Sequence, residues 1–173
     1  MEDDKVLLRR YQDDLNVGGY GVILLGAWTV LKIILEILVE FRGDGGLDLP
    51  EFNQDEKIIV VVVIALIAAG FLLISLLIFR IHLYIGLNAS RAAKGQPYKK
   101  GYYTGAVILF VLSVLGISLY GNDIQDLDTI DTTIASIIVD LTTIYVLGTV
   151  IVSTNRIKAL QSKQTQEQTD HAG

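Results

Sequence analysis

Four long apolar segments alternate with charged segments along this chain of 173 residues. They cover residues 18–40, 58–79, 102–120 and 132–153. A helix needs about 20 apolar residues to cross a hydrocarbon core of roughly 30 Å, and each segment has about that length. Lipid offers the backbone no hydrogen-bond partners, and four segments are too few to close a membrane barrel. The pattern therefore predicts four transmembrane helices within a domain that covers residues 18–156.

Basic residues are distributed unequally between the segments that link the spans. The N-terminal tail, the link between spans two and three and the C-terminal tail hold most of the lysines and arginines, whereas the other two links are acidic. The positive-inside rule places such basic segments in the cytoplasm. We expect a multi-pass protein of a prokaryotic plasma (inner) membrane, with both the N- and the C-terminus cytoplasmic.

The polar flanks complete the predicted fold, which is all-α. Within residues 1–17, apolar side chains recur at helical spacing and indicate an amphipathic cytoplasmic helix. This helix either lies at the inner membrane interface or packs on a cytoplasmic loop. The second helix is expected to extend past its span to about Gly95, because the next proline is Pro97. We therefore predict an integral membrane four-helix bundle with an N-terminal amphipathic helix and an extended second helix, followed by a disordered tail over 157–173.

The composition excludes several classes of function. Hydrophobic residues make up 51% of the chain and the mean hydropathy is +0.50, which is typical of a membrane protein. The chain has no cysteine, so disulfides, thiolate catalysis and cysteine metal sites are impossible. A net charge of −5 argues against nucleic acid as a partner. The sequence lacks the catalytic and metal-binding motifs of common enzymes, so we expect no enzyme activity, catalytic residue, cofactor or metal site.

Three charged residues interrupt the apolar pattern of the first and fourth spans. Lys32 and Glu36 lie within the segment TVLKIILEILVEF, and Asp140 lies in the fourth span. A charge at the bilayer centre costs roughly 2.5–3.5 kcal/mol on the insertion scale, so it needs a partner. At about 1.5 Å per residue, Lys32 and Asp140 reach similar depths from opposite sides. We predict an intramembrane pair between them, which serves as a structural ion pair, as part of an ion path, or as a contact with another subunit.

Small and hydroxylated residues share a helical face with these charges. Such residues let membrane helices approach closely and form hydrogen bonds, so we expect both faces to turn inward. Span one has Gly18, Gly21, Leu25, Thr29, Lys32 and Glu36 on this face, and span four has Thr133, Ser136, Asp140, Thr143 and Thr154. Span two contributes the small pair Ala65 and Ala69.

Two surface clusters predict weaker contacts. Aspartates in the link between spans three and four form a candidate outer surface for divalent cations, at Asp123, Asp126 and Asp128. Lysines in the link between spans two and three are candidates for contact with lipid headgroups, at Lys94, Lys99 and Lys100. Tyrosines beside these lysines fit an interfacial aromatic belt on the same side, at Tyr84, Tyr98, Tyr102 and Tyr103.

The short polar links and the small-residue faces favour a non-enzymatic accessory or assembly component that acts through helix–helix contacts. Its expected partners are the lipid bilayer and either a second copy of the chain or another membrane protein. The alternative is a small oligomeric ion or solute transporter or channel that uses Lys32, Glu36 and Asp140.

A charge swap tests the predicted pair. Lys32→Asp and Asp140→Lys each leave two like charges together in the membrane, so each alone should lower folded yield and unfolding midpoint in detergent. The double variant restores opposite charges and should recover both quantities. Equal damage in the double variant would discard the pairing.

Overall fold

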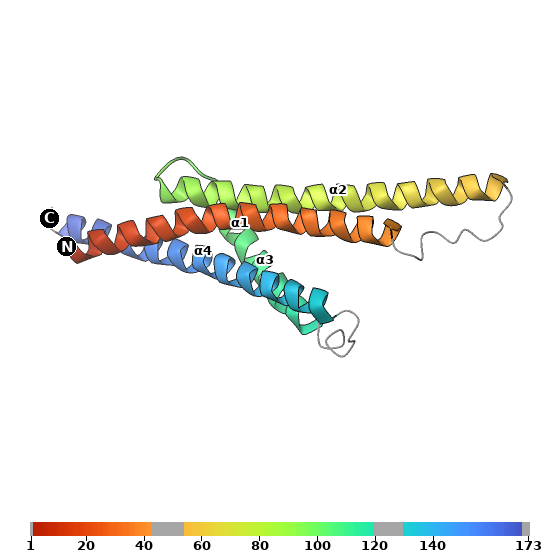
Figure 1. Cartoon of the computed structure of the whole chain (residues 1–173). Coiled ribbons are helices and arrows are strands. Elements are labelled where there is room, and N and C mark those ends of the chain that lie inside the picture. The colour runs from red at the N-terminus through yellow and green to blue at the C-terminus, as the bar shows by residue number, and fades with distance from the viewer. Residues whose placement is uncertain (1, 43–53, 120–129, 171–173) are drawn as a thin grey trace. The chain divides into compact units, whose positions relative to one another are not determined.

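The computed structural model describes residues 2–42, 54–119 and 130–170, and the side chains of residues 3–35, 58–118, 137–166 and 169. Four helices make up nearly all of this part: α1 (Glu2–Arg42), α2 (Gln54–Ala93), α3 (Gly101–Leu119) and α4 (Ile130–Asp170), as Figure 1 shows. The described ranges contain no strand. The all-α prediction is confirmed.

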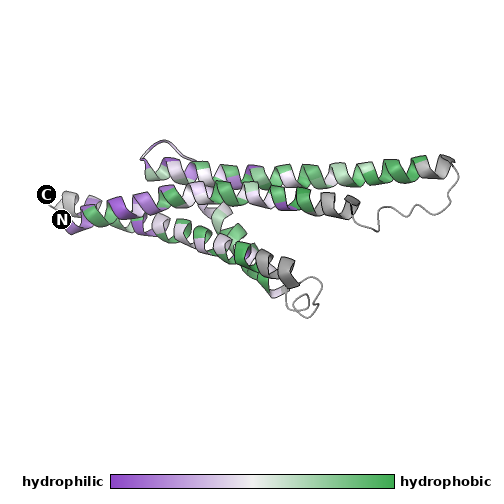
Figure 2. Ribbon diagram, viewed as in Figure 1, coloured by the Kyte–Doolittle hydropathy of each residue, from purple (hydrophilic) through white to green (hydrophobic). Residues whose placement is uncertain are grey.

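Each of the four helices is long and apolar enough to cross a membrane. The qualifying segments are Asp3–Leu35, Ile58–Ala93, Gly101–Ser118 and Ile137–Gln166. The segment in α2 is the most apolar, with a hydropathy of 3.2. In Figure 2, hydrophobic residues line most of α2, and hydrophilic residues gather at the first turns of α1 and the last turns of α4. The chain is a multi-pass membrane protein built from helices, as the apolar pattern predicts.

The helices are divided between two compact units. Unit 1 comprises Met1–Ile23 and Leu83–Gly173, and it therefore includes the start of α1, the end of α2 and all of α3 and α4. Unit 2 comprises Leu24–His82, which is the remainder of α1 and α2. The buried apolar core lies in unit 1 and consists of Leu15, Val22, Ile85, Ala89, Ala93, Tyr102, Ala106, Leu147, Val150 and Ile157.

Two glycines bring α1 and α2 into backbone contact in unit 1. A Cβ placed on Gly19 would lie 2.7 Å from the carbonyl oxygen of Gly86 and 3.0 Å from the amide nitrogen of Ser90. A Cβ on Gly86 would in turn overlap the carbonyl oxygen of Gly19 and the side chain of Ile23. Such close approach maximises van der Waals contact, which is the main force between helices in lipid.

A second pair of glycines faces α4 within the same unit. Cβ atoms on Gly18 and Gly21 would each lie 2.9 Å from a valine methyl group, of Val150 and Val146 respectively. Both glycines belong to the face of span one that was predicted to turn inward. For these two residues, the prediction is confirmed.

The second helix ends as its sequence predicts. Gly95 follows the last turn with φ at +66°, a conformation that glycine adopts without steric cost. The amide of Gly95 donates to the carbonyl of Ala92, and the amide of Gln96 donates to that of Arg91. These two hydrogen bonds form a Schellman motif, which satisfies carbonyls at the helix end. The helix therefore stops at Ala93, and Pro97 follows in the loop.

The N-terminal segment is continuous with span one. Residues 2–17 are the first turns of α1, where Leu15 is buried and Leu8 and Tyr11 pack against the core. These turns pack on the core of unit 1, because α2, α3 and α4 contribute buried side chains to the same cluster and leave an apolar surface for Leu15 to cover. Placement of the segment at the inner membrane interface or on a cytoplasmic loop stays a prediction.

The predicted disorder of the C-terminal tail is wrong for residues 157–170. These residues continue α4 as far as Asp170. The tail offers little apolar surface, but it contains no proline or glycine before Asp170 and is rich in glutamine and lysine, which favour helix. Extending an existing helix also avoids the cost of nucleation. Residues 171–173 lie outside the described part.

Substitution of Gly86 should separate α1 from α2. Gly86→Ala forces the backbones apart, and we expect a loss of about 1–3 kcal/mol in the free energy of unfolding, measured by denaturant titration in mixed micelles. Gly70→Ala is the matched control in the same helix, because nothing lies within 4 Å of a Cβ at that position. Equal stability of the two variants would contradict the close packing at Gly19 and Gly86.

Candidate functional site: a polar layer in unit 1

Polar side chains connect α1 to α2 next to the close glycine contact. The hydroxyl of Ser90 donates a hydrogen bond of 2.6 Å to Oδ1 of Asn16. One turn further along α2, Nζ of Lys94 donates to the hydroxyl of Tyr20 at 3.2 Å and lies 5.5 Å from the centre of its ring. Because the backbones nearly touch at Gly19, even the short side chain of Ser90 reaches across the interface.

A second set of contacts joins α3 to α4. The hydroxyls of Tyr102 and Thr154, both buried, lie 3.0 Å apart. Thr154 uses its one proton to donate to the carbonyl of Val150, so Tyr102 is the donor in the pair. The next tyrosine, Tyr103, accepts a hydrogen bond from Nδ2 of Asn155 at 3.2 Å.

Asn88 attaches the loop between α2 and α3 to the end of α2. Its Nδ2 donates to the carbonyl of Tyr84 at 2.7 Å, and its Oδ1 accepts the backbone N–H of Lys99 at 2.9 Å. The side chain is buried. Both halves of the amide are thus used to hold the loop in one conformation.

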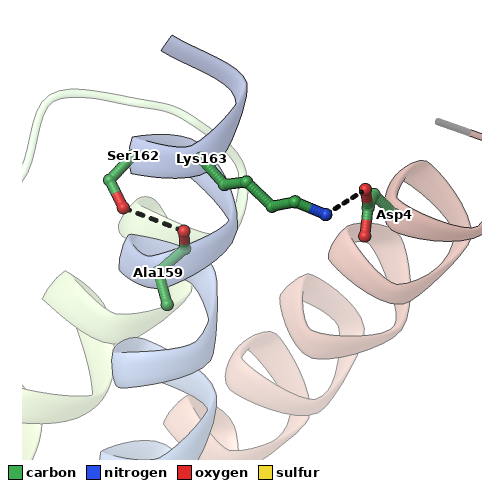
Figure 3. Close-up of polar contacts among 4 residues, drawn as sticks. All are labelled: Asp4, Ala159, Ser162 and Lys163. Carbon is green, nitrogen blue, oxygen red and sulfur yellow. Dashed lines mark hydrogen bonds and ion pairs between the residues drawn. The ribbon is translucent and has the colours of Figure 1, made fainter. Parts of the chain in front are cut away.

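An ion pair joins the first turns of α1 to the last turns of α4. Nζ of Lys163 lies 3.1 Å from a carboxylate oxygen of Asp4, as Figure 3 shows. Next to Lys163 on α4, the hydroxyl of Ser162 donates to the carbonyl of Ala159 at 2.9 Å. The lysine side chain is more than half exposed, so solvent screening keeps the contribution of this pair small.

The polar layer, which we define as Asn16, Asn88, Ser90, Tyr102 and Thr154, is internally satisfied. Among the described residues, no buried side-chain nitrogen or oxygen lacks a hydrogen-bond partner. Hydrogen bonds between membrane helices contribute about 0.6 kcal/mol each on average. These hydrogen bonds therefore have a structural role: they hold the helices of unit 1 in fixed positions relative to one another.

The structure places the predicted charges in different units. Lys32 is half-buried in unit 2, and Asp140 is half-buried in unit 1. Each takes part in a polar or electrostatic interaction. The pairing of Lys32 with Asp140 stays a prediction. Glu36 belongs to α1, but its side chain lies outside the described part.

The hydroxyls that accompany these charges are bonded within their own helices. Thr29 donates to the carbonyl of Leu25, and Thr143 donates to that of Val139. Such a bond satisfies the hydroxyl in an apolar environment, so the hydroxyl needs no partner on another helix.

Of the two predicted surface clusters, the structure describes the lysines but not the aspartates. Asp123, Asp126 and Asp128 lie outside the described residues, so the cation surface stays a prediction. Lys94, Lys99 and Lys100 are all exposed at the loop between α2 and α3. Within the described residues, no group of three or more histidines or acids lies close enough together to hold a metal ion.

Most of the polar layer escapes sequence analysis. Asn16 and Asn88 stand among ordinary helical residues, and no spacing rule connects Asn16 with Ser90. The sequence pattern predicts an inward face for Thr154, which is buried, but it places the partner Tyr102 in an aromatic belt at the interface. The glycine cluster at residues 18–21 is the one available signal, because glycine allows the close approach that short polar side chains need.

Comparison with models of protein families, with curated proteins and with solved structures found no match for this chain.

The bond between Tyr102 and Thr154 can be measured by a double-mutant cycle. We expect Tyr102→Phe and Thr154→Val to show a coupling energy of about 0.6–1.7 kcal/mol in denaturant titrations, the range for membrane hydrogen bonds. Tyr103→Phe is the control, because its bond to Asn155 is exposed and should contribute less. A coupling energy indistinguishable from zero would contradict the structural role of the bond between Tyr102 and Thr154.

Proposed function

We propose that this protein is a non-enzymatic accessory or assembly component of a prokaryotic plasma (inner) membrane, with both termini in the cytoplasm. It acts by presenting a transmembrane helix face to a partner. The orientation is supported by the basic residues of the tails and of the loop between α2 and α3. The proposal is supported by the packing of unit 1, whose buried side chains hold parts of all four helices together.

The central part of α2 is the observation on which the proposal depends. The qualifying segment of this helix is the most apolar of the four, yet only 6% of its most apolar window is buried. Ala65 and Ala69 are exposed on one face of α2, and a Cβ on Gly70 would meet nothing within 4 Å. Small side chains gain little from lipid contact but allow another helix to approach closely. A partner helix therefore fits this face better than acyl chains do.

The chain suits a crosslinking experiment because it contains no cysteine. In membranes, the Ala65→Cys variant should form a disulfide-linked dimer if the partner is a second copy of the chain. If the partner is another membrane protein, an added bifunctional crosslinker should give a product of constant mass. Adding Ala69→Leu should abolish the product, because the larger side chain blocks close approach. Ile67→Phe adds similar bulk about 200° around the helix and should leave crosslinking unchanged.

Two outcomes would contradict the proposal. Crosslinking that is unaffected by Ala69→Leu would mean that this face does not mediate association. Reconstituted protein that dissipates a proton or cation gradient, and loses this activity in Asp140→Asn, would support the transporter alternative instead.

A further inference from the structure

One end of unit 1 has a surface with basic residues and no acidic ones over long stretches. Residues 83–118 and 141–166 contain no aspartate or glutamate. The same stretches contain seven lysines and arginines, and all seven are exposed: Arg91, Lys94, Lys99, Lys100, Arg156, Lys158 and Lys163. Acids of unit 1 near this end belong to the first turns of α1, where Asp4 pairs with Lys163, and to the end of α4, at Glu167 and Asp170.

Tyr103 joins the basic residues of the loop to those of α4. The ammonium group of Lys158 lies 4.7 Å from the centre of its ring, a cation–π distance. The hydroxyl accepts from Asn155, which immediately precedes Arg156. The amide of Tyr103 donates to the carbonyl of Lys100. One tyrosine therefore contacts both the backbone of Lys100 and the ammonium group of Lys158, although 58 positions separate these lysines in the sequence.

The loop that presents these groups is held in one conformation. Asn88 binds the amide of Lys99, and the Schellman motif at Gly95 fixes the chain before it. The rings of Tyr98 and Tyr102 pack edge to face with their centres 5.7 Å apart. The described residues offer the exposed side chains of Lys99 and Lys100 no hydrogen bond or ion pair. Their charges are available to an external anion.

We propose that this surface binds the phosphate groups of anionic phospholipids in the adjacent leaflet. We call it the basic-aromatic rim and define it as Lys94, Lys99, Lys100, Arg156 and Lys158 with Tyr20, Tyr98 and Tyr103. Two of its lysines, Lys94 and Lys158, each lie over a tyrosine ring. Tyrosine rings prefer the level of the lipid headgroups, so they place these ammonium groups at the depth of the phosphates.

The position of the rim favours a bilayer over a soluble partner. Lys99 and Lys100 directly precede the segment Gly101–Ser118, which is apolar enough to span the membrane. Positive charge next to a span lies within a Debye length, about 8 Å at physiological salt, of the leaflet surface. This inference depends on the membrane placement of the helices and not on the proposed accessory function.

The lipid selectivity of the reconstituted protein tests directly whether the basic-aromatic rim binds anionic phospholipids. The full chain is reconstituted in phosphatidylcholine vesicles, and electron paramagnetic resonance compares spin-labelled phosphatidylglycerol with spin-labelled phosphatidylcholine at the protein boundary. We expect the wild type to prefer phosphatidylglycerol, and Lys99→Gln with Lys100→Gln to reduce the preference by about twofold or more. Lys99→Arg with Lys100→Arg keeps the charges and should retain it.

A matched control separates the rim from net charge alone. Lys5→Gln with Arg9→Gln removes two exposed cations from the same end of unit 1, but next to the acids of α1. This variant should keep the preference for phosphatidylglycerol. An equal loss in the control, or no loss in the Lys99 and Lys100 variant, would overturn the proposal. Loss of the wild-type preference on adding inorganic phosphate at constant ionic strength would also overturn it, because it would indicate a site for free anions.

Discussion

The inability of lipid to hydrogen-bond the backbone is the constraint on which this structure depends. It requires each span to satisfy its own amides and carbonyls, and long helices do so. The polar side chains within the helices follow the same rule. The hydroxyls of Ser75, Thr142 and Thr149 donate to carbonyls four residues earlier in the chain. Each helix therefore satisfies most of its own hydrogen-bonding groups, with little need for a neighbouring helix.

Self-sufficient helices in lipid associate weakly, since burial of leucine against leucine gains little over burial against acyl chains. Close packing and a few hydrogen bonds must supply the specificity. In this chain both are found in unit 1, where Gly19 meets Gly86 and where Tyr102 meets Thr154. Unit 1 also includes the polar first turns of α1 and the last turns of α4. Leu15 of α1 and Ile157 of α4 are buried in the core of this unit, and burial of apolar surface stabilises the packing wherever it removes that surface from water.

The positions and lengths of the helices follow from the sequence, whereas the contacts between the helices do not. Apolar length alone predicts the four helices, and Gly95 with Pro97 predicts the end of α2 to within two residues. Low hydrophobicity predicts disorder beyond residue 156, whereas helix propensity and continuity with α4 make residues 157–170 helical. The polar layer depends on which residues of distant helices face each other. Asn16 and Ser90 are 74 positions apart, and no local pattern encodes that relation.

The central claim is that the apolar helices lie in lipid, and the single tryptophan tests it most directly. Trp28 belongs to the candidate span Asp3–Leu35, and 47% of its surface is exposed. Reconstituted in vesicles, its fluorescence should be quenched strongly by lipids brominated on their acyl chains and weakly by acrylamide in the buffer. Strong quenching by acrylamide with little effect of brominated lipids would place Trp28 in water and contradict the membrane assignment.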